Sequence, residues 1–141
     1  MDDLVRWYGE QLDADAARAT TAAEELGADW DYDDGYVVTR REGDMVATGS
    51  QDFLEAERGR FIAEHDPARV LRDIEAKRAL LHEHRIDGWR CSTCANEETF
   101  DDDADGNREW SRGGKDFPCP TLRLIAAPYA DRPGYREEWR P

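Results

Sequence analysis

Apolar side chains recur at helical spacing near the start of the chain. Four of them stand seven residues apart, with Tyr8 and Ala22 beside them: Val5, Leu12, Ala19 and Leu26. This period predicts a helix from Asp3 to Gly27, which Asp2 or Asp3 can cap and Gly27 can end. Because the middle of this helix is rich in alanine, we expect it to pack by one narrow face.

Short runs of β-favouring residues follow an acidic segment. Residues 28–35 are rich in aspartate and are expected to form a loop. Residues 36–41 and 45–48 flank the Gly-containing turn at residues 42–44, which predicts a β-hairpin. Since an isolated hairpin is only marginally stable in water, we expect it to pack on the helices.

Two further helices are predicted next to each other. The apolar residues Phe53, Leu54, Phe61 and Ile62 indicate a helix over residues 51–64. A second helix is predicted over residues 67–84, with Asp66 as its N-cap and Pro67 as its first residue. The pair forms an αα unit.

The second half of the chain contains a long segment without clear periodicity. Residues 86–118 carry several glycine turn signals and are expected to be an irregular loop, which is uncommon unless something organises it. Pro120 opens a short helix over residues 121–127, and Pro128 ends or kinks it. Tyr135 and Trp139 in the tail, residues 131–141, are expected to dock back on the body.

These elements predict an α+β fold that is predominantly helical. It has an N-terminal helix, a β-hairpin, an αα unit, a zinc-organised loop and a short C-terminal helix. A length of 141 residues suits a single domain over residues 1–141. Within it, residues 1–64 hold the first helix, the hairpin and the next helix, and residues 65–141 hold the rest.

The charge balance narrows the classes of partner. Nineteen Lys and Arg against 33 Asp and Glu give a net charge of −14, which repels the nucleic-acid backbone. Five Trp, five Tyr and four Phe indicate a folded core rather than an acidic disordered tail. With no long apolar run and no basic N-terminal stretch, we expect a cytoplasmic protein that does not enter membranes.

The cysteines and histidines suggest a metal site. Two residues separate Cys91 from Cys94, a spacing that lets both thiolates bind one ion. Cys119 stands just before a predicted helix, and the N–H groups at the start of that helix would lower the pKa of the Cys119 thiol. Tetrahedral zinc in a Cys3His site needs one histidine more, and His82 and His84 both precede the loop. Their periodicity does not decide between them.

Other interpretations of the same residues remain open. The three cysteines can be small buried residues, or Cys91 and Cys94 can form a redox pair with Cys119 as third partner. If zinc binds, four protein ligands make a closed structural site without an open position for catalysis.

Three further patterns suggest chemistry but are incomplete. Asp101, Asp103, Asp105 and Gly106 match the first half of a calcium-binding loop, but its twelfth position is Arg112 instead of Glu. His82-Glu83-His84 lacks the i, i+4 spacing of a metalloprotease helix. His65, before Asp66, is expected to be a locally bonded turn residue rather than a catalytic one.

Several blocks of the sequence resemble a known family. They lie between about Ile62 and Pro141 and occur in this order: His65–Leu71, Glu75–Arg78, His84, Cys91-x-x-Cys94, Pro118–Leu124, Ala126, Pro128–Asp131 and Tyr135. In this order the chain resembles a small actinobacterial family of unknown function that some actinophages also carry. The resemblance implies that His84, rather than His82, is the fourth ligand. It also implies that a site relying on a histidine common in the family is absent here, because Phe61 takes that position.

Three functional hypotheses follow. The first is a zinc-binding regulatory or protein-interaction module without catalytic activity, whose metal ligands are His84, Cys91, Cys94 and Cys119 and whose acidic loops and first helix meet a protein partner. The second is a phage-type or host inhibitor that mimics nucleic acid with its acidic surface. The third is an enzyme, either a thiol-redox protein that uses Cys91 and Cys94 or a metal-assisted one.

Overall fold

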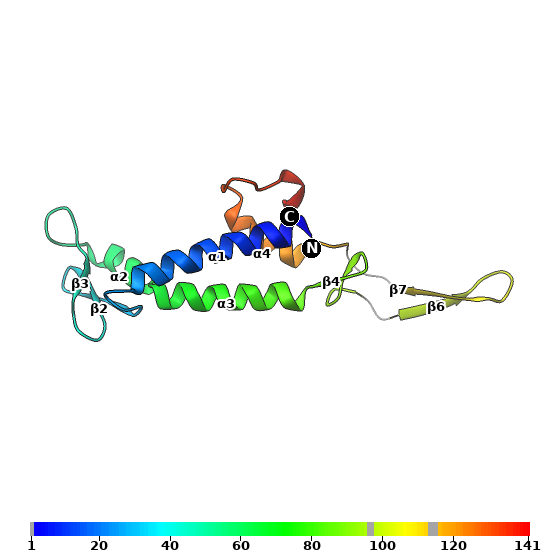
Figure 1. The fold of residues 1–141 in the computed structure, drawn as a ribbon, viewed down its shortest axis with the longest axis horizontal. Coiled ribbons are helices and arrows are strands. Elements are labelled where there is room, and N and C mark those ends of the chain that lie inside the picture. The colour runs from blue at the N-terminus through cyan, green and yellow to red at the C-terminus, as the bar shows by residue number, and fades with distance from the viewer. Residues whose placement is uncertain (1, 96–97, 113–115) are drawn as a thin grey trace. The chain divides into compact units, whose positions relative to one another are not determined.

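A computed structural model describes residues 2–95, 98–112 and 116–141. At residues 98–99 and 110–112 it describes the backbone only. The chain divides into two units. The terminal unit consists of Met1–Glu10 and Lys77–Pro141, and the central unit consists of Gln11–Ala76. Within the described residues the fold is α+β, with four α-helices and small antiparallel sheets, as expected (Figure 1). That residues 1–141 fold as a single domain stays a prediction.

The first helix, α1 (Asp3–Ala23), begins where the sequence predicts. The Asp2 carboxylate accepts a hydrogen bond of 2.8 Å from the Leu4 amide and so caps the helix. The helix ends four residues earlier than expected, and Gly27, at φ +81°, closes the end by donating to the carbonyl of Ala23.

The central unit contains a three-stranded sheet instead of the expected two-stranded hairpin. The strands are β1 (Trp30–Asp33), β2 (Tyr36–Thr39) and β3 (Met45–Ala47), paired antiparallel in that order. The expectation of a loop at residues 28–35 is therefore wrong. Asp34 and Gly35, both at positive φ, form the tight turn that joins β1 to β2.

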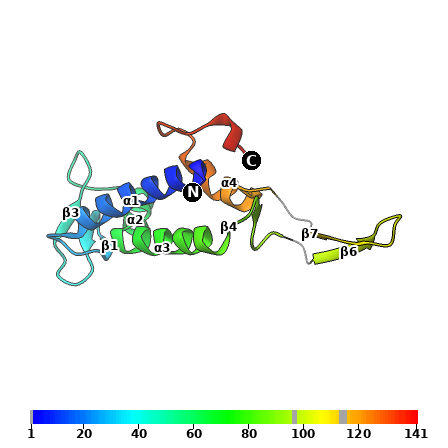
Figure 2. The ribbon, with the colours of Figure 1, turned by 45° about the vertical axis from the view of Figure 1, so that its right-hand side comes forward.

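Two helices follow the sheet, and the central unit ends at Ala76, within the second of them. The first, α2 (Ala56–Glu64), packs on β1 and β2 (Figure 2). It starts later than the predicted residue 51, because Asp52 takes a left-handed φ of +69° and the Glu55 carboxylate caps the helix. The second, α3 (Pro67–Glu83), begins as predicted after Asp66, whose carboxylate accepts a hydrogen bond of 2.8 Å from the Arg69 amide.

The segment expected to be irregular contains two hairpins. One is β4 (Ile86–Asp87) with β5 (Arg90–Cys91), and the other is β6 (Glu98–Asp102) with β7 (Arg108–Arg112). The prediction of a structureless loop over residues 86–118 is thus wrong for most of the described part of that segment.

The end of the chain belongs to the terminal unit and forms part of its core. Helix α4 (Pro120–Ala126) runs into a 3₁₀ turn, η1 (Ala127–Tyr129), and a second such turn, η2 (Glu137–Trp139), lies near the end. The Trp7 ring contacts those of Tyr135 and Trp139, each with centroids 5.5 Å apart, and its Nε1 donates to the Pro133 carbonyl. The predicted docking of the tail is confirmed.

Candidate metal centre

The end of α3 places His84 in the terminal unit. The His84 amide still donates to the Leu80 carbonyl, so the residue continues the last helical turn and its direction is set by the helix. His84 is half-buried, whereas His82, two residues earlier, is exposed. Divergent directions of residues two apart on a helix explain this difference.

The β4–β5 hairpin brings the Cys-x-x-Cys segment back to the end of α3. Cys91 pairs with Ile86 across the hairpin and is fully buried. The hydroxyls of Ser92 and Thr93, between the two cysteines, both donate to the carbonyl of Glu83. They satisfy a carbonyl at the helix end that has no partner within the helix. The segment is therefore fastened to α3 by more than the cysteines.

Cys119 arrives from the other direction as the residue before α4. It takes an extended conformation at the N-cap, with φ −70° and ψ 164°, and its side chain is fully buried. The Phe117 amide donates to the Trp89 carbonyl, and Asp116 forms a β-bridge with Arg90. These backbone contacts hold the approach to Cys119 against the β4–β5 hairpin.

The three sulfurs converge on one ring nitrogen. His84 Nδ1 lies 3.4 Å from Cys91 Sγ, 3.6 Å from Cys94 Sγ and 3.5 Å from Cys119 Sγ. All four atoms lie within 4.8 Å of one another. Zinc bonds of about 2.3 Å to sulfur and about 2.0 Å to nitrogen imply a tetrahedral N-to-S edge of about 3.5 Å. The four side chains therefore form a candidate metal site whose spacing suits a tetrahedral ion.

The thiols affect each other's ionisation. Burial opposes ionisation of Cys91, but hydrogen bonds from the amides of Cys94 and Thr93 outweigh it and hold the pKa of Cys91 below its ordinary value. Burial, together with the neighbouring thiols of Cys91 and Cys119, raises the pKa of Cys94 to about 11. Crowding several thiolates is unfavourable without a cation, and a divalent ion reverses that balance. All three cysteines are free thiols.

The four residues predicted as ligands lie close together, with His84 rather than His82 beside the cysteines. Whether these residues bind zinc stays a prediction. The hydroxyls of Ser92 and Thr93 were missed. No local signal could have found them, because the β4–β5 hairpin separates both residues from the helix end that they cap.

The two other patterns have structural roles. In the calcium-like segment, Asp103 lies in the turn between β6 and β7, where its carboxylate accepts hydrogen bonds from the amides of Asp105 and Asn107. The side chain of Arg112 lies outside the described residues. His65 follows α2, and its Nδ1 lies 2.7 Å from the Phe61 carbonyl. This is the local hydrogen bond expected of a turn histidine.

Comparison with protein families gives one match. The model of a family of unknown function, DUF6221, matches residues 1–141. The chain belongs to this family. The match includes the N-terminal half, over which the resemblance described above did not extend. An actinobacterial or phage origin stays a prediction.

The family model carries no activity with it. Comparisons with curated proteins and with solved structures give no match. No helix in the described ranges combines the length and the apolar character that crossing a bilayer requires. The functional argument for this DUF6221 protein therefore rests on its own residues.

Proposed function

We propose that this protein is a small zinc-stabilised module that acts by binding a protein partner and has no catalytic activity. The observation that carries the zinc assignment is the convergence of Cys91, Cys94 and Cys119 on His84 Nδ1, at 3.4–3.6 Å. Three thiolates and one imidazole are the donor set of structural zinc sites. With four protein ligands no coordination position remains for a substrate.

Zinc would link three elements that are distant in sequence. His84 directly follows α3, Cys91 and Cys94 belong to the β4–β5 hairpin and the turn after it, and Cys119 precedes α4. The hairpin itself has only two residues in each strand. So short a hairpin is not stable alone in water, and a metal that joins it to two helices supplies the missing free energy.

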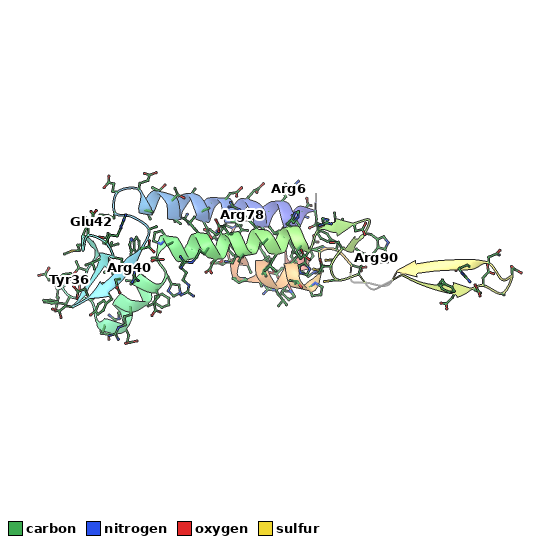
Figure 3. The ribbon with its side chains drawn as sticks, turned by 90° about the horizontal axis from the view of Figure 1, so that it is seen from below. Arg6, Tyr36, Arg40, Glu42, Arg78 and Arg90 are labelled. Carbon is green, nitrogen blue, oxygen red and sulfur yellow. The ribbon has the colours of Figure 1, made fainter. Side chains whose placement is uncertain are left out.

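The partner surface we favour lies on this hairpin. Ile86 and Trp89 are 49% and 58% exposed, and the Arg90 guanidinium stacks on the Trp89 ring at 4.3 Å. Figure 3 shows Arg90 at this hairpin. Arg90 itself is half-buried. An exposed Trp side chain with a neighbouring Arg is typical of residues that dominate protein interfaces. This location differs from the acidic loops and first helix that the sequence suggested, and both surfaces stay predictions.

The zinc assignment is tested with a matched pair of histidine variants. Metal content is measured by mass spectrometry on protein purified without a histidine tag. We expect one zinc per chain in the wild type and in His82→Ala, and loss of zinc in His84→Ala and in Cys91→Ser, which should also lose folding cooperativity. Equal zinc in His84→Ala and His82→Ala would contradict the assignment.

The interaction hypothesis is tested with Trp89→Ala. Its zinc content should equal that of the wild type, because Trp89 contributes no ligand. Its association with a captured partner, measured by cross-linking, should fall at least tenfold. Phe53→Ala changes a similarly exposed aromatic residue of the central unit and should retain that association. Unchanged association of Trp89→Ala would place the partner surface elsewhere.

A further inference from the structure

The central unit contains a pocket with an unusual concentration of arginine. Its volume is about 340 Å³, and its walls include four arginines and two aromatic residues: Arg40, Arg60, Arg69, Arg72, Trp30 and Tyr32. Pockets of about 300–1,000 Å³ hold small-molecule ligands. We call this site the arginine pocket.

The four guanidinium groups come from three elements. Arg40 directly follows β2, Arg60 lies on α2, and Arg69 and Arg72 are three residues apart on α3, so that they are neighbours on one helix face. Figure 3 shows Arg40 beside the strands of the central unit. Convergence of like charges from separate elements is unfavourable unless an anion stands between them.

Carboxylates pair with only some of these arginines. Asp66 is buried and already accepts hydrogen bonds from the amides of Trp30 and Arg69. Asp31 is 3.6 Å from Arg40, at the long end of an ion pair between exposed side chains. Glu64 is the third acid. Arg60 also forms an ion pair of 2.8 Å with Glu57 of its own helix, outside the lining. The arginines of the lining without a carboxylate within 4.0 Å in the described residues are therefore Arg69 and Arg72.

Two arginines retain unused donors. The Arg69 guanidinium donates one hydrogen bond of 3.1 Å, to the Glu64 carbonyl, which leaves most of its five N–H groups available. Arg72 is exposed and makes no hydrogen bond or ion pair with the part of the chain that the structure describes. A planar guanidinium group with free N–H donors can donate two parallel hydrogen bonds to the oxygens of one phosphate.

The aromatic wall of the pocket is held in place by the fold. Trp30 Nε1 donates to the Gly27 carbonyl, and the Tyr32 hydroxyl donates to the Leu54 carbonyl. The Tyr32 ring lies against Gly59 of α2, where a Cβ atom would overlap it. Both rings are therefore positioned before any ligand arrives, which lowers the entropic cost of binding.

We propose that the arginine pocket binds a phosphate-bearing small molecule. The guanidinium groups of Arg40, Arg69 and Arg72 hold the phosphate, and the rings of Trp30 and Tyr32 contact the apolar part of the ligand. Phosphate is favoured over a single carboxylate because it presents more oxygens to donors that arrive from separate elements. A small ligand is favoured over a polymer because the acidic remainder of the surface repels an extended polyanion.

The test is calorimetric titration of the zinc-loaded full chain with AMP and with inorganic phosphate at low salt. We expect both to bind, with AMP tighter because its ring contacts the aromatic wall. Arg72→Gln should weaken AMP binding about tenfold, the effect of losing one charge-assisted contact. Arg58→Gln is the control, since it removes the same charge from α2 outside the pocket lining.

Three results would overturn the proposal. The first is that neither AMP nor inorganic phosphate binds at concentrations up to about 10 mM, which corresponds to the weakest affinity of interest. The second is an equal loss in Arg72→Gln and Arg58→Gln, which would indicate a diffuse charge effect. The third is acetate or citrate binding as tightly as AMP, which would assign the pocket to carboxylates. Retained stability of Arg72→Gln in urea confirms that its loss of binding is not unfolding.

Discussion

Two glycines within helices differ in how closely other atoms pack against them. At Gly9 of α1, nothing lies within 4 Å of the position that a Cβ would take. At Gly59 of α2, which is buried, an added Cβ would overlap the Tyr32 ring. Glycine weakens a helix in both places, but only at Gly59 does the packing of α2 on β1 require it.

The two alanine variants should therefore change stability in opposite directions. Gly9→Ala should raise the free energy of unfolding by about 0.5–1 kcal/mol through helix propensity alone. Gly59→Ala should lower it by about 1–3 kcal/mol, because the Tyr32 ring must move. Urea unfolding measures both. A stabilised Gly59→Ala would show that α2 does not pack closely on Tyr32.

The candidate ligands were predictable at this scale because their signal is local. The spacing of Cys91 and Cys94 limits how far apart their thiols can lie, and Pro120 marks Cys119 as the residue before a helix. The choice between His82 and His84 was not local. It depends on the direction in which α3 ends, which apolar periodicity alone did not give.

Among the elements, helices with cap signals were predicted best. Asp66 and Pro67 identified the start of α3 correctly, because the cap and the first turn are neighbours in sequence. Strand β1 was missed because its aspartates obscured the alternation of half-buried Trp30 and Tyr32 with exposed neighbours. The Asp34–Gly35 pair was the available signal for the turn that follows.

The Asp66 carboxylate connects two elements of the central unit. It caps α3 by accepting a hydrogen bond from the Arg69 amide, and it also accepts a hydrogen bond of 3.1 Å from the Trp30 amide of β1. Asp66→Ala should lower the free energy of unfolding by about 1–3 kcal/mol, since it removes the cap and leaves the part-buried Trp30 amide without its acceptor. Asp73→Ala, an exposed change on the same helix, is the control in urea unfolding. Equal stability of the two variants would exclude this role.

The turn of the β6–β7 hairpin should respond to pH. Hydrogen bonds from the amide and side chain of Asn107 lower the pKa of Asp103. A carboxylate whose pKa is lower in the folded form stabilises the turn above the ordinary aspartate pKa, and this contribution is lost as pH falls through the folded value. The NMR chemical shift of the Asn107 amide should therefore change only at pH values below the ordinary pKa of aspartate.

Two substitutions check that assignment. Asp103→Ala should give the acidic spectrum of the turn at neutral pH, because it removes the acceptor. Asp105→Ala should leave the Asn107 amide unchanged, since it is the Asp105 backbone N–H that takes part in the turn. An Asn107 shift that follows Asp105 instead would contradict the account.

For the whole molecule, contacts distant in sequence were the hardest to foresee. The first residues of α1 and the last residues of the chain share one unit, in which Tyr8 contacts Tyr129 with ring centroids 5.3 Å apart. The sequence indicated that Tyr135 and Trp139 dock, because aromatic residues in a tail bury apolar area. It gave no means of finding Trp7 as their partner.

The central claim is that a zinc ion holds the end of α3, the β4–β5 hairpin and the start of α4 together. The most direct measurement is native mass spectrometry combined with thiol counting, with and without chelator. We expect one zinc per chain and three thiols that react only after chelation. A metal-free chain with reactive thiols, or with a disulfide between Cys91 and Cys94, would contradict the account and favour the redox hypothesis.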